Sequence, residues 1–276
     1  MDPSPVIDVE ALADQLADVT VLDVRYRLAG PAGPGEYAAG HVPGAVYVDL
    51  DTALAAPPGL GGRHPLPDSD VFCEAMRRAG VRQDRPVVTY DDFGGLAAAR
   101  AWWLLRHYGH RSVAVLDGGW PAWGASGHRV ETGPPAEIES GDFSGAPGAM
   151  PVVDVDAVTQ VGVLMDVRAP ERFRGEVEPI DPVAGHIPGA VNVPTGQTLD
   201  EHGLLRRPEE LAALFGSVGA VPGTDVATYC GSGVTAAHAV LALELAGVSA
   251  ALYPGSWSEW ITDPQRQVSR SSRRRT

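Results

Sequence analysis

The strongest constraint on the fold of this chain is that its sequence repeats at the scale of a domain. Four blocks recur in the same order: VLDVR at 21–25 and LMDVR at 164–168, GHVPGAVYV at 40–48 and GHIPGAVNV at 185–193, VVTYDD at 87–92 and VATYCG at 226–231, LDGGWPAW at 116–123 and YPGSWSEW at 253–260. The offsets lie between 137 and 145 residues, which is the size of an ordinary domain. Because 276 residues also exceed what one core usually organises, the sequence predicts a tandem repeat of one domain.

A stretch rich in Pro and Gly separates the two copies. It contains TGPPAE and SGAPGAMP, a composition that does not continue a helix. We therefore predict a first domain over residues 1–131, a linker over 132–151 and a second domain over 152–276.

Each copy alternates short β-branched runs with helical patterns. The first copy has VTVLDV, RPVVTY and SVAVLD around GGLAAARAWWLLRHYG, and the second has GVLMDV, DVATY and SAALY around VTAAHAVLALELAG. Strands that alternate with helices imply right-handed crossovers. We predict that each domain is α/β, with a mainly parallel sheet and helices on both faces.

Composition excludes several classes of function. A net charge of −14 argues against nucleic acid or an anionic membrane as the main partner. All 21 basic residues are arginine, so mechanisms that need a lysine are absent. No stretch is apolar enough for a membrane span, and the start MDPSPVIDVE lacks the features of a secretory signal. We expect a cytoplasmic protein that is a monomer or weak dimer.

Cys230 is the residue that points to chemistry. The chain has two cysteines, too few for a disulfide framework or a four-thiolate metal site, and Cys73 lies in a helical apolar pattern typical of a core. Cys230 ends an apolar run and precedes a helix that starts near Val234, with Gly231 and Gly233 between them. N–H groups and a helix dipole that converge there would favour a thiolate or a persulfide, Cys–S–S⁻.

The first copy provides an internal control, because Asp91 stands where the second copy has Cys230. An acid at that place cannot accept sulfur, so we expect one copy to catalyse and the other to support it. A cysteine phosphatase would need an arginine six residues after the cysteine, where Ala236 stands. A module that carries a persulfide or binds a partner without turnover is the main alternative.

The paired blocks, the acid in the first copy and the CGSGVT loop resemble the two-domain rhodanese-type sulfurtransferases over most of the chain. The resemblance implies that sulfane sulfur moves from a small anionic donor, 3-mercaptopyruvate or thiosulfate, to cyanide or a thioredoxin-like thiol through a persulfide of Cys230. No cofactor and no metal are implied. The loop residues that would hold the transferred sulfur and the donor are Gly231, Ser232, Gly233, Val234 and Thr235.

The resemblance also implies residues outside the loop. Asp51 would orient His64, which would move a proton through Ser232 as the donor's sulfur leaves. Two arginines bind the donor carboxylate in the 3-mercaptopyruvate branch. Arg172 occupies the first place, the second falls on Asp181, and Arg174 is the arginine expected to compensate. Both donors therefore stay open.

Overall fold

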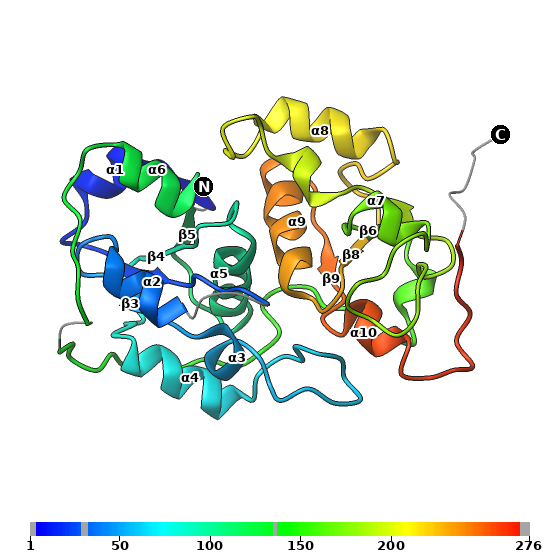
Figure 1. Cartoon of the computed structure of the whole chain (residues 1–276), viewed down its shortest axis with the longest axis horizontal. Helices are drawn as coiled ribbons and strands as arrows, with labels where there is room; N and C mark the ends of the chain where they lie inside the picture. The colour runs from blue at the N-terminus through cyan, green and yellow to red at the C-terminus, as the bar shows by residue number, and fades with distance from the viewer. Residues whose placement is uncertain (1–3, 29–32, 135–136, 271–276) are drawn as a thin grey trace. The chain divides into compact units, whose positions relative to one another are not determined.

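The computed structural model describes residues 4–28, 33–134 and 137–270 and divides into two units. The first unit comprises Met1–Ala56, Leu66–Met150 and His202–Leu204, and the second comprises Pro57–Pro65, Pro151–Glu201 and Leu205–Thr276. Figure 1 shows the helices and strands of each unit and labels most of them. The segment that carries His64 therefore belongs to the second unit, although it lies early in the chain.

The sheet of the first unit has the order β1-β5-β4-β2-β3, and its paired strands are parallel. Its strands are β1 Val6–Ile7, β2 Thr20–Asp23, β3 Val46–Tyr47, β4 Val87–Tyr90 and β5 Val113–Leu116. Its helices are α1 Val9–Asp14, α2 Gly33–Ala39, α3 Leu50–Ala53, α4 Ser69–Arg78, α5 Leu96–His107 and α6 Gly119–Ala125. Helices α1, α2 and α6 share a core with Val88 and Tyr90. The side chain of Thr89 points to the other face, where it bonds to α5.

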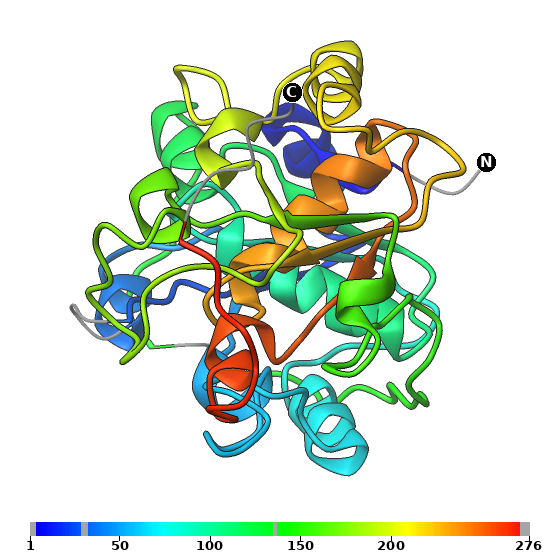
Figure 2. The same cartoon turned by 90° about the vertical axis from the view of Figure 1, so that its right-hand side faces the viewer.

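The sheet of the second unit has the order β7-β6-β8-β9, again parallel. Its strands are β6 Val163–Asp166, β7 Val191–Asn192, β8 Val226–Tyr229 and β9 Ala251–Leu252. Its helices are α7 Pro170–Phe173, α8 Pro208–Gly216, α9 Val234–Leu245 and α10 Ser256–Trp260, with 3-10 turns at Val158–Gln160 and Thr195–Thr198. In Figure 2, α9 (orange) runs alongside the strands of this sheet.

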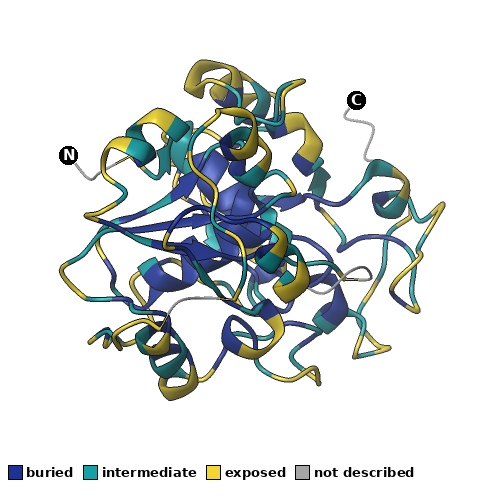
Figure 3. Ribbon diagram, turned by 60° about the vertical axis from the view of Figure 1, so that its left-hand side comes forward, coloured by how far each residue is buried: buried dark blue, intermediate teal, exposed yellow. Residues whose placement is uncertain are grey.

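Two cores cover the two faces of this second sheet. Leu164 and Ala227 pack with α7 and α10, whereas their neighbours Met165 and Val226 pack with α8 and α9. Successive strand residues thus face opposite helical layers, and Figure 3 shows most strand residues in the dark blue of buried residues. The predicted fold, two α/β domains with parallel sheets covered on both faces, is confirmed.

The stretch between the two copies has no helix or strand over residues 137–151, but it does pack. Phe143 is fully buried, and its N–H donates to the carbonyl of Val81 at 3.2 Å. A Pro- and Gly-rich segment can be ordered without regular structure when other carbonyl groups receive its N–H groups. This segment is therefore fastened to the first unit.

Candidate active site

Cys230 lies in the turn between β8 and α9. Gly233 caps the helix with φ +81, and its N–H donates to Cys230 Sγ at 3.1 Å. A Cβ atom at Gly233 would lie 2.2 Å from the carbonyl oxygen of Pro254, so only glycine fits this turn. Cys230 itself is 3% exposed. The N-terminal end of α9, with its positive dipole, meets a buried thiol.

A second segment holds the backbone of this loop. The N–H groups of Trp257 and Ser258 donate to the carbonyl groups of Cys230 and Gly231 at 3.0 and 2.9 Å. The N–H of Cys230 donates to Ser256 Oγ at 3.1 Å, and Ser256 Oγ donates to the carbonyl of Tyr253 at 2.9 Å. The start of α10 therefore fixes the orientation of the cysteine.

Ser256 was not predicted as a site residue. It is fully buried and has φ 54, the one positive φ outside glycine among the described residues. The equivalent residue of the first copy is Gly119, also with φ 54. A serine at a position that its own repeat fills with glycine was the available sequence signal, because such a backbone is strained for a residue with a side chain.

Ser232 and His64 meet, as predicted. His64 Nδ1 lies 2.7 Å from Ser232 Oγ, and both residues are 8% exposed. The segment that carries His64 packs beside α10, because the N–H of Arg63 donates to Ser258 Oγ at 3.0 Å. Asp51 lies in α3, in the first unit. Its predicted role in orienting His64 stays a prediction.

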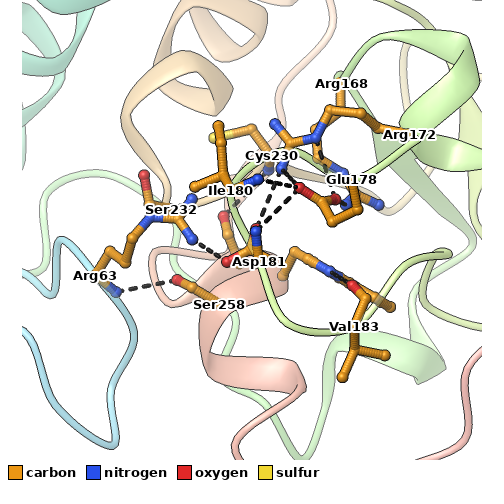
Figure 4. A network of polar contacts seen from close by, with 12 residues as sticks. Arg63, Arg168, Arg172, Glu178, Ile180, Asp181, Val183, Cys230, Ser232 and Ser258 are labelled. Carbon is orange, nitrogen blue, oxygen red and sulfur yellow. Dashed lines mark hydrogen bonds and ion pairs between the residues drawn. The ribbon is translucent and has the colours of Figure 1, made fainter. Parts of the chain in front are cut away.

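Arg172 lies at the cysteine loop, in a cluster of charges shown in Figure 4. Its guanidinium pairs with Glu178 Oε1 at 2.7 Å and with Asp181 Oδ2 at 3.1 Å. Arg63 pairs with the other oxygen of Asp181. A Cβ atom at Gly231 would lie 2.8 Å from Arg63 Nη2 and 3.7 Å from Arg172 Nη1 and Nη2. Two guanidinium groups thus border the loop, and Arg63 was not predicted.

The two acids of this cluster differ in their electrostatics. Burial raises the pKa of Asp181, against the opposing charge of Arg63. Burial alone would also raise the pKa of Glu178, but the hydrogen bond from Arg172 and the N–H of Asp181 hold that pKa below its ordinary value. Glu178 is therefore stabilised in its ionised form beside Arg172, whereas ionisation of Asp181 costs more free energy.

Arg174 follows α7 and points elsewhere. It pairs with Glu176 at 2.7 Å, and its side chain is 40% exposed. Side chains of residues two positions apart on a helical turn face different directions. Arg172 and Arg174 therefore do not border the same site. Val234 and Thr235, also predicted, form the first turn of α9.

The equivalent loop of the first copy holds a carboxylate. Asp91 Oδ1 accepts from the N–H groups of Phe93 and Gly95 at 2.8 and 2.9 Å, and Oδ2 accepts from Ala97 and Ala98 at 2.7 and 3.0 Å. Burial raises the pKa of Asp91, while these four donors favour the charged form. We call such a loop, between the end of a strand and the start of a helix, a cradle. The cradle of the first copy accommodates a negatively charged group and donates hydrogen bonds to it.

Neither a metal cluster nor a membrane span is found within 4–28, 33–134 and 137–270. No group of three or more His, Cys, Asp or Glu side chains in these ranges is placed to hold a metal ion. No helix there is long and apolar enough to cross a membrane.

The fold and the loop define a tandem α/β protein in which one of two equivalent strand-to-helix cradles carries a thiol. The sequence matches the family described as Rhodanese-like domain twice, over residues 8–126 and 154–263. This chain belongs to the rhodanese-like family, in the two-domain form of its sulfurtransferases.

Two curated relatives are similar over nearly the whole chain. The "Putative thiosulfate sulfurtransferase SseB" of Mycobacterium tuberculosis is 45% identical over 268 residues, 92% of each chain. The "Probable 3-mercaptopyruvate sulfurtransferase" of Pseudomonas aeruginosa is 45% identical over 281 residues, 97% of this chain and 99% of that one.

The fold also matches a solved structure closely. The 3-mercaptopyruvate sulfurtransferase SseA from Escherichia coli has a TM-score of 0.81 and 34% identity, and the match covers 93% of this chain and 100% of that one. The relatives thus carry the names of two different sulfur donors.

Proposed function

We propose that the protein is a sulfurtransferase of the EC 2.8.1 type in which Cys230 carries the transferred sulfur as a persulfide. The Cys230 thiolate attacks the outer sulfur of the donor and forms an S–S bond, and the bond that held this sulfur in the donor breaks. Thiosulfate then leaves as sulfite. 3-Mercaptopyruvate leaves as pyruvate, and the proton of its thiol is transferred to the methyl carbon. In the second step cyanide, or a thioredoxin-like thiol, removes the outer sulfur and regenerates the thiolate.

One observation carries this proposal: the Gly233 N–H donates to Cys230 Sγ at 3.1 Å, at the N-terminal end of α9. N–H donors aimed at developing negative charge stabilise an anionic intermediate without reorganisation. The first copy supports a role for such a loop in stabilising negative charge, since four N–H groups there converge on the Asp91 carboxylate.

The hydrogen bond between His64 and Ser232 supports a proton route for one donor. Transfer from 3-mercaptopyruvate needs a proton moved from sulfur to carbon, whereas transfer from thiosulfate needs none. General acid–base groups act on such a step when they lie within hydrogen-bond distance of each other and of the substrate. We assign this relay to Ser232 and His64, with Asp51 orienting the imidazole.

We also propose that the protein acts in the cytoplasm. Cys73 and Cys230 are both free thiols, which is typical of a reducing compartment such as the cytoplasm. We expect the chain to act as a monomer or weak dimer on small anionic donors, with neither nucleic acid nor membrane as a partner.

Steady-state assays test the function. With cyanide as acceptor, we expect thiocyanate from both donors, together with sulfite from thiosulfate and pyruvate from 3-mercaptopyruvate. A protein that forms none of these products is not a sulfurtransferase. A persulfide that forms without turnover would favour the non-catalytic carrier, and hydrolysis of an aryl phosphate at a comparable rate would favour the phosphatase.

A further inference from the structure

Two arginines at the cysteine loop have N–H groups that are not used in hydrogen bonds within the described residues. Nη2 of Arg63 and both Nη atoms of Arg172 lie beside Gly231, as the position of a Cβ atom there shows. Arg63 Nε is buried and finds no hydrogen-bond acceptor among the described residues. A buried donor left without an acceptor costs free energy. A small anion beside Gly231 would supply acceptors to both guanidinium groups.

Asp181 competes with such an anion for the same two arginines. One carboxylate oxygen pairs with Arg63 Nη1 and the other with Arg172 Nη2 at 3.1 Å (Figure 4). The Asp181 side chain is 3% exposed, so little solvent screens its charge. Asp181 therefore behaves as an internal anion that uses part of the binding capacity of the arginine pair.

The charges of the cluster are balanced before a donor enters. Arg172 also pairs with Glu178. A third guanidinium, that of Arg168, contacts Glu178 at 3.5 Å and pairs with Asp166 at 2.6 Å. Three guanidinium groups therefore face three carboxylates, and an incoming donor adds negative charge that this set does not neutralise. Its repulsion by Asp181 is proportional to the charge that it brings.

We propose that Arg63 and Arg172 bind the anionic end of the sulfur donor, and that Asp181 selects among donors by charge and favours a monoanion over a dianion. This inference rests on the sulfurtransferase function proposed above. At neutral pH 3-mercaptopyruvate carries one negative charge and thiosulfate carries two. Asp181 thus makes the site discriminate against thiosulfate without contacting the reacting sulfur.

The kinetic test is Asp181→Asn, which keeps the shape of the side chain and an acceptor oxygen. We take a separation of about 8 Å between the Asp181 carboxylate and the charge of the donor, and an effective dielectric constant of about 40. With these values we expect KM to fall roughly 5-fold for 3-mercaptopyruvate and roughly 25-fold for thiosulfate. Arg63→Gln should raise both KM values. Glu176→Gln is the matched control, because it removes the same charge from an exposed acid of the same segment. Equal factors for the two donors, or the same shift in Glu176→Gln, would overturn the inference.

A second measurement does not depend on sulfur transfer. Cys230 is alkylated with iodoacetate, an anion, and with iodoacetamide, which is neutral, and peptide mass spectrometry separates Cys230 from Cys73. We expect the ratio of the iodoacetate rate to the iodoacetamide rate to rise roughly 5-fold in Asp181→Asn and to fall in Arg63→Gln. A ratio that moves in neither variant refutes the charge selection. A ratio that moves in a protein that transfers no sulfur refutes the proposed function alone.

Discussion

Between β4 and α5 the loop holds Asp91, whereas between β8 and α9 the equivalent loop holds Cys230. Both loops follow a buried strand, and both end in a helix-capping glycine with positive φ, Gly95 at 78 and Gly233 at 81. Each capping glycine donates its N–H to the residue at the strand end, at 2.9 Å to Asp91 Oδ1 and at 3.1 Å to Cys230 Sγ. The first loop is one residue longer, since its glycine lies four residues after the acid.

The comparison of the two loops indicates where an outer sulfur on Cys230 would lie. In the first copy the N–H groups of Ala97 and Ala98 also bind the carboxylate, and aligning the capping glycines matches them to Thr235 and Ala236. The oxygens of an aspartate and the outer sulfur of a cysteine persulfide lie the same number of bonds from Cβ. The oxygens of Asp91 thus mark the place that an outer sulfur on Cys230 would take.

Removing the thiol is the largest test of this comparison. Cys230→Ala deletes the nucleophile, and we expect kcat/KM for either donor to fall roughly 10⁴-fold or more. Cys73→Ala is the control, because that thiol is buried in α4, and it should retain activity. Residual turnover of Cys230→Ala within tenfold of the wild type would remove Cys230 from the mechanism.

Removing the acid should affect stability. Asp91→Ala leaves four N–H groups without their acceptor, three of them buried and that of Phe93 partly buried, and we expect a loss of about 4 kcal/mol of unfolding free energy in urea. Asp92→Ala breaks a partly exposed ion pair with Arg27 and should cost about 1 kcal/mol or less. Equal costs for the two variants would mean that the cradle does not need its anion.

The serine separates the two donors. Ser232→Ala should lower kcat for 3-mercaptopyruvate about 100-fold and leave thiosulfate turnover within twofold. The reason is that only the first reaction moves a proton to carbon. Measuring both donors on one preparation checks this, and a loss that is the same for both would exclude the relay.

The helices that follow the two loops differ in a buried basic residue. In α5, Arg100 donates to the carbonyl of Leu54. In α9, the ring nitrogens of His238 have no hydrogen-bond partner within the described part of the chain, and burial lowers the pKa of His238 to about 4.

The unfolded chain binds a proton at His238 near pH 6.5, so stability is lost as the pH falls from 6.5 toward 4. Between pH 7.5 and 5 we expect His238→Leu to lose about 2 kcal/mol less unfolding free energy than the wild type. Unfolding in urea at both pH values measures this, and parallel losses would show that His238 does not titrate in this way.

The smallest expected effect concerns the start of α10. Ser256→Gly restores the residue that the first copy has at Gly119, so it relieves backbone strain but removes the oxygen that accepts the Cys230 N–H. We expect kcat/KM to fall about tenfold, which is about 1.4 kcal/mol, with stability unchanged or slightly higher. Ser258→Gly removes the hydroxyl that receives the Arg63 N–H instead. A clear loss of stability in Ser256→Gly would contradict the proposed strain at this position.

The parts of the molecule that local pattern determines were predictable. The β-branched runs became β2, β4, β5, β6, β8 and β9, and the long apolar helices became α5 and α9. The cysteine loop followed from the same logic, because a strand end, two glycines and a helix start lie next to one another in the sequence. Ser232 and His64 were paired through the family resemblance and do lie together.

Contacts between distant segments were not predictable in this way. Arg63 and Asp181 are 118 residues apart, and no periodicity links them. Pro57–Pro65 packs with the second unit although it precedes most of the first. Arg174 was expected to compensate for the missing second arginine, but a helical turn directs the side chains of Arg172 and Arg174 apart.

The proposed reaction depends on the loop between β8 and α9 accepting a second sulfur at Cys230. The most direct measurement is the intact mass of the wild type and of Cys230→Ala after incubation with each donor, with peptide mapping of the modified site. We predict a gain of one sulfur atom, located on Cys230 and absent from Cys73 and from the variant. An unchanged mass with both donors, or the same gain in Cys230→Ala, would contradict the account.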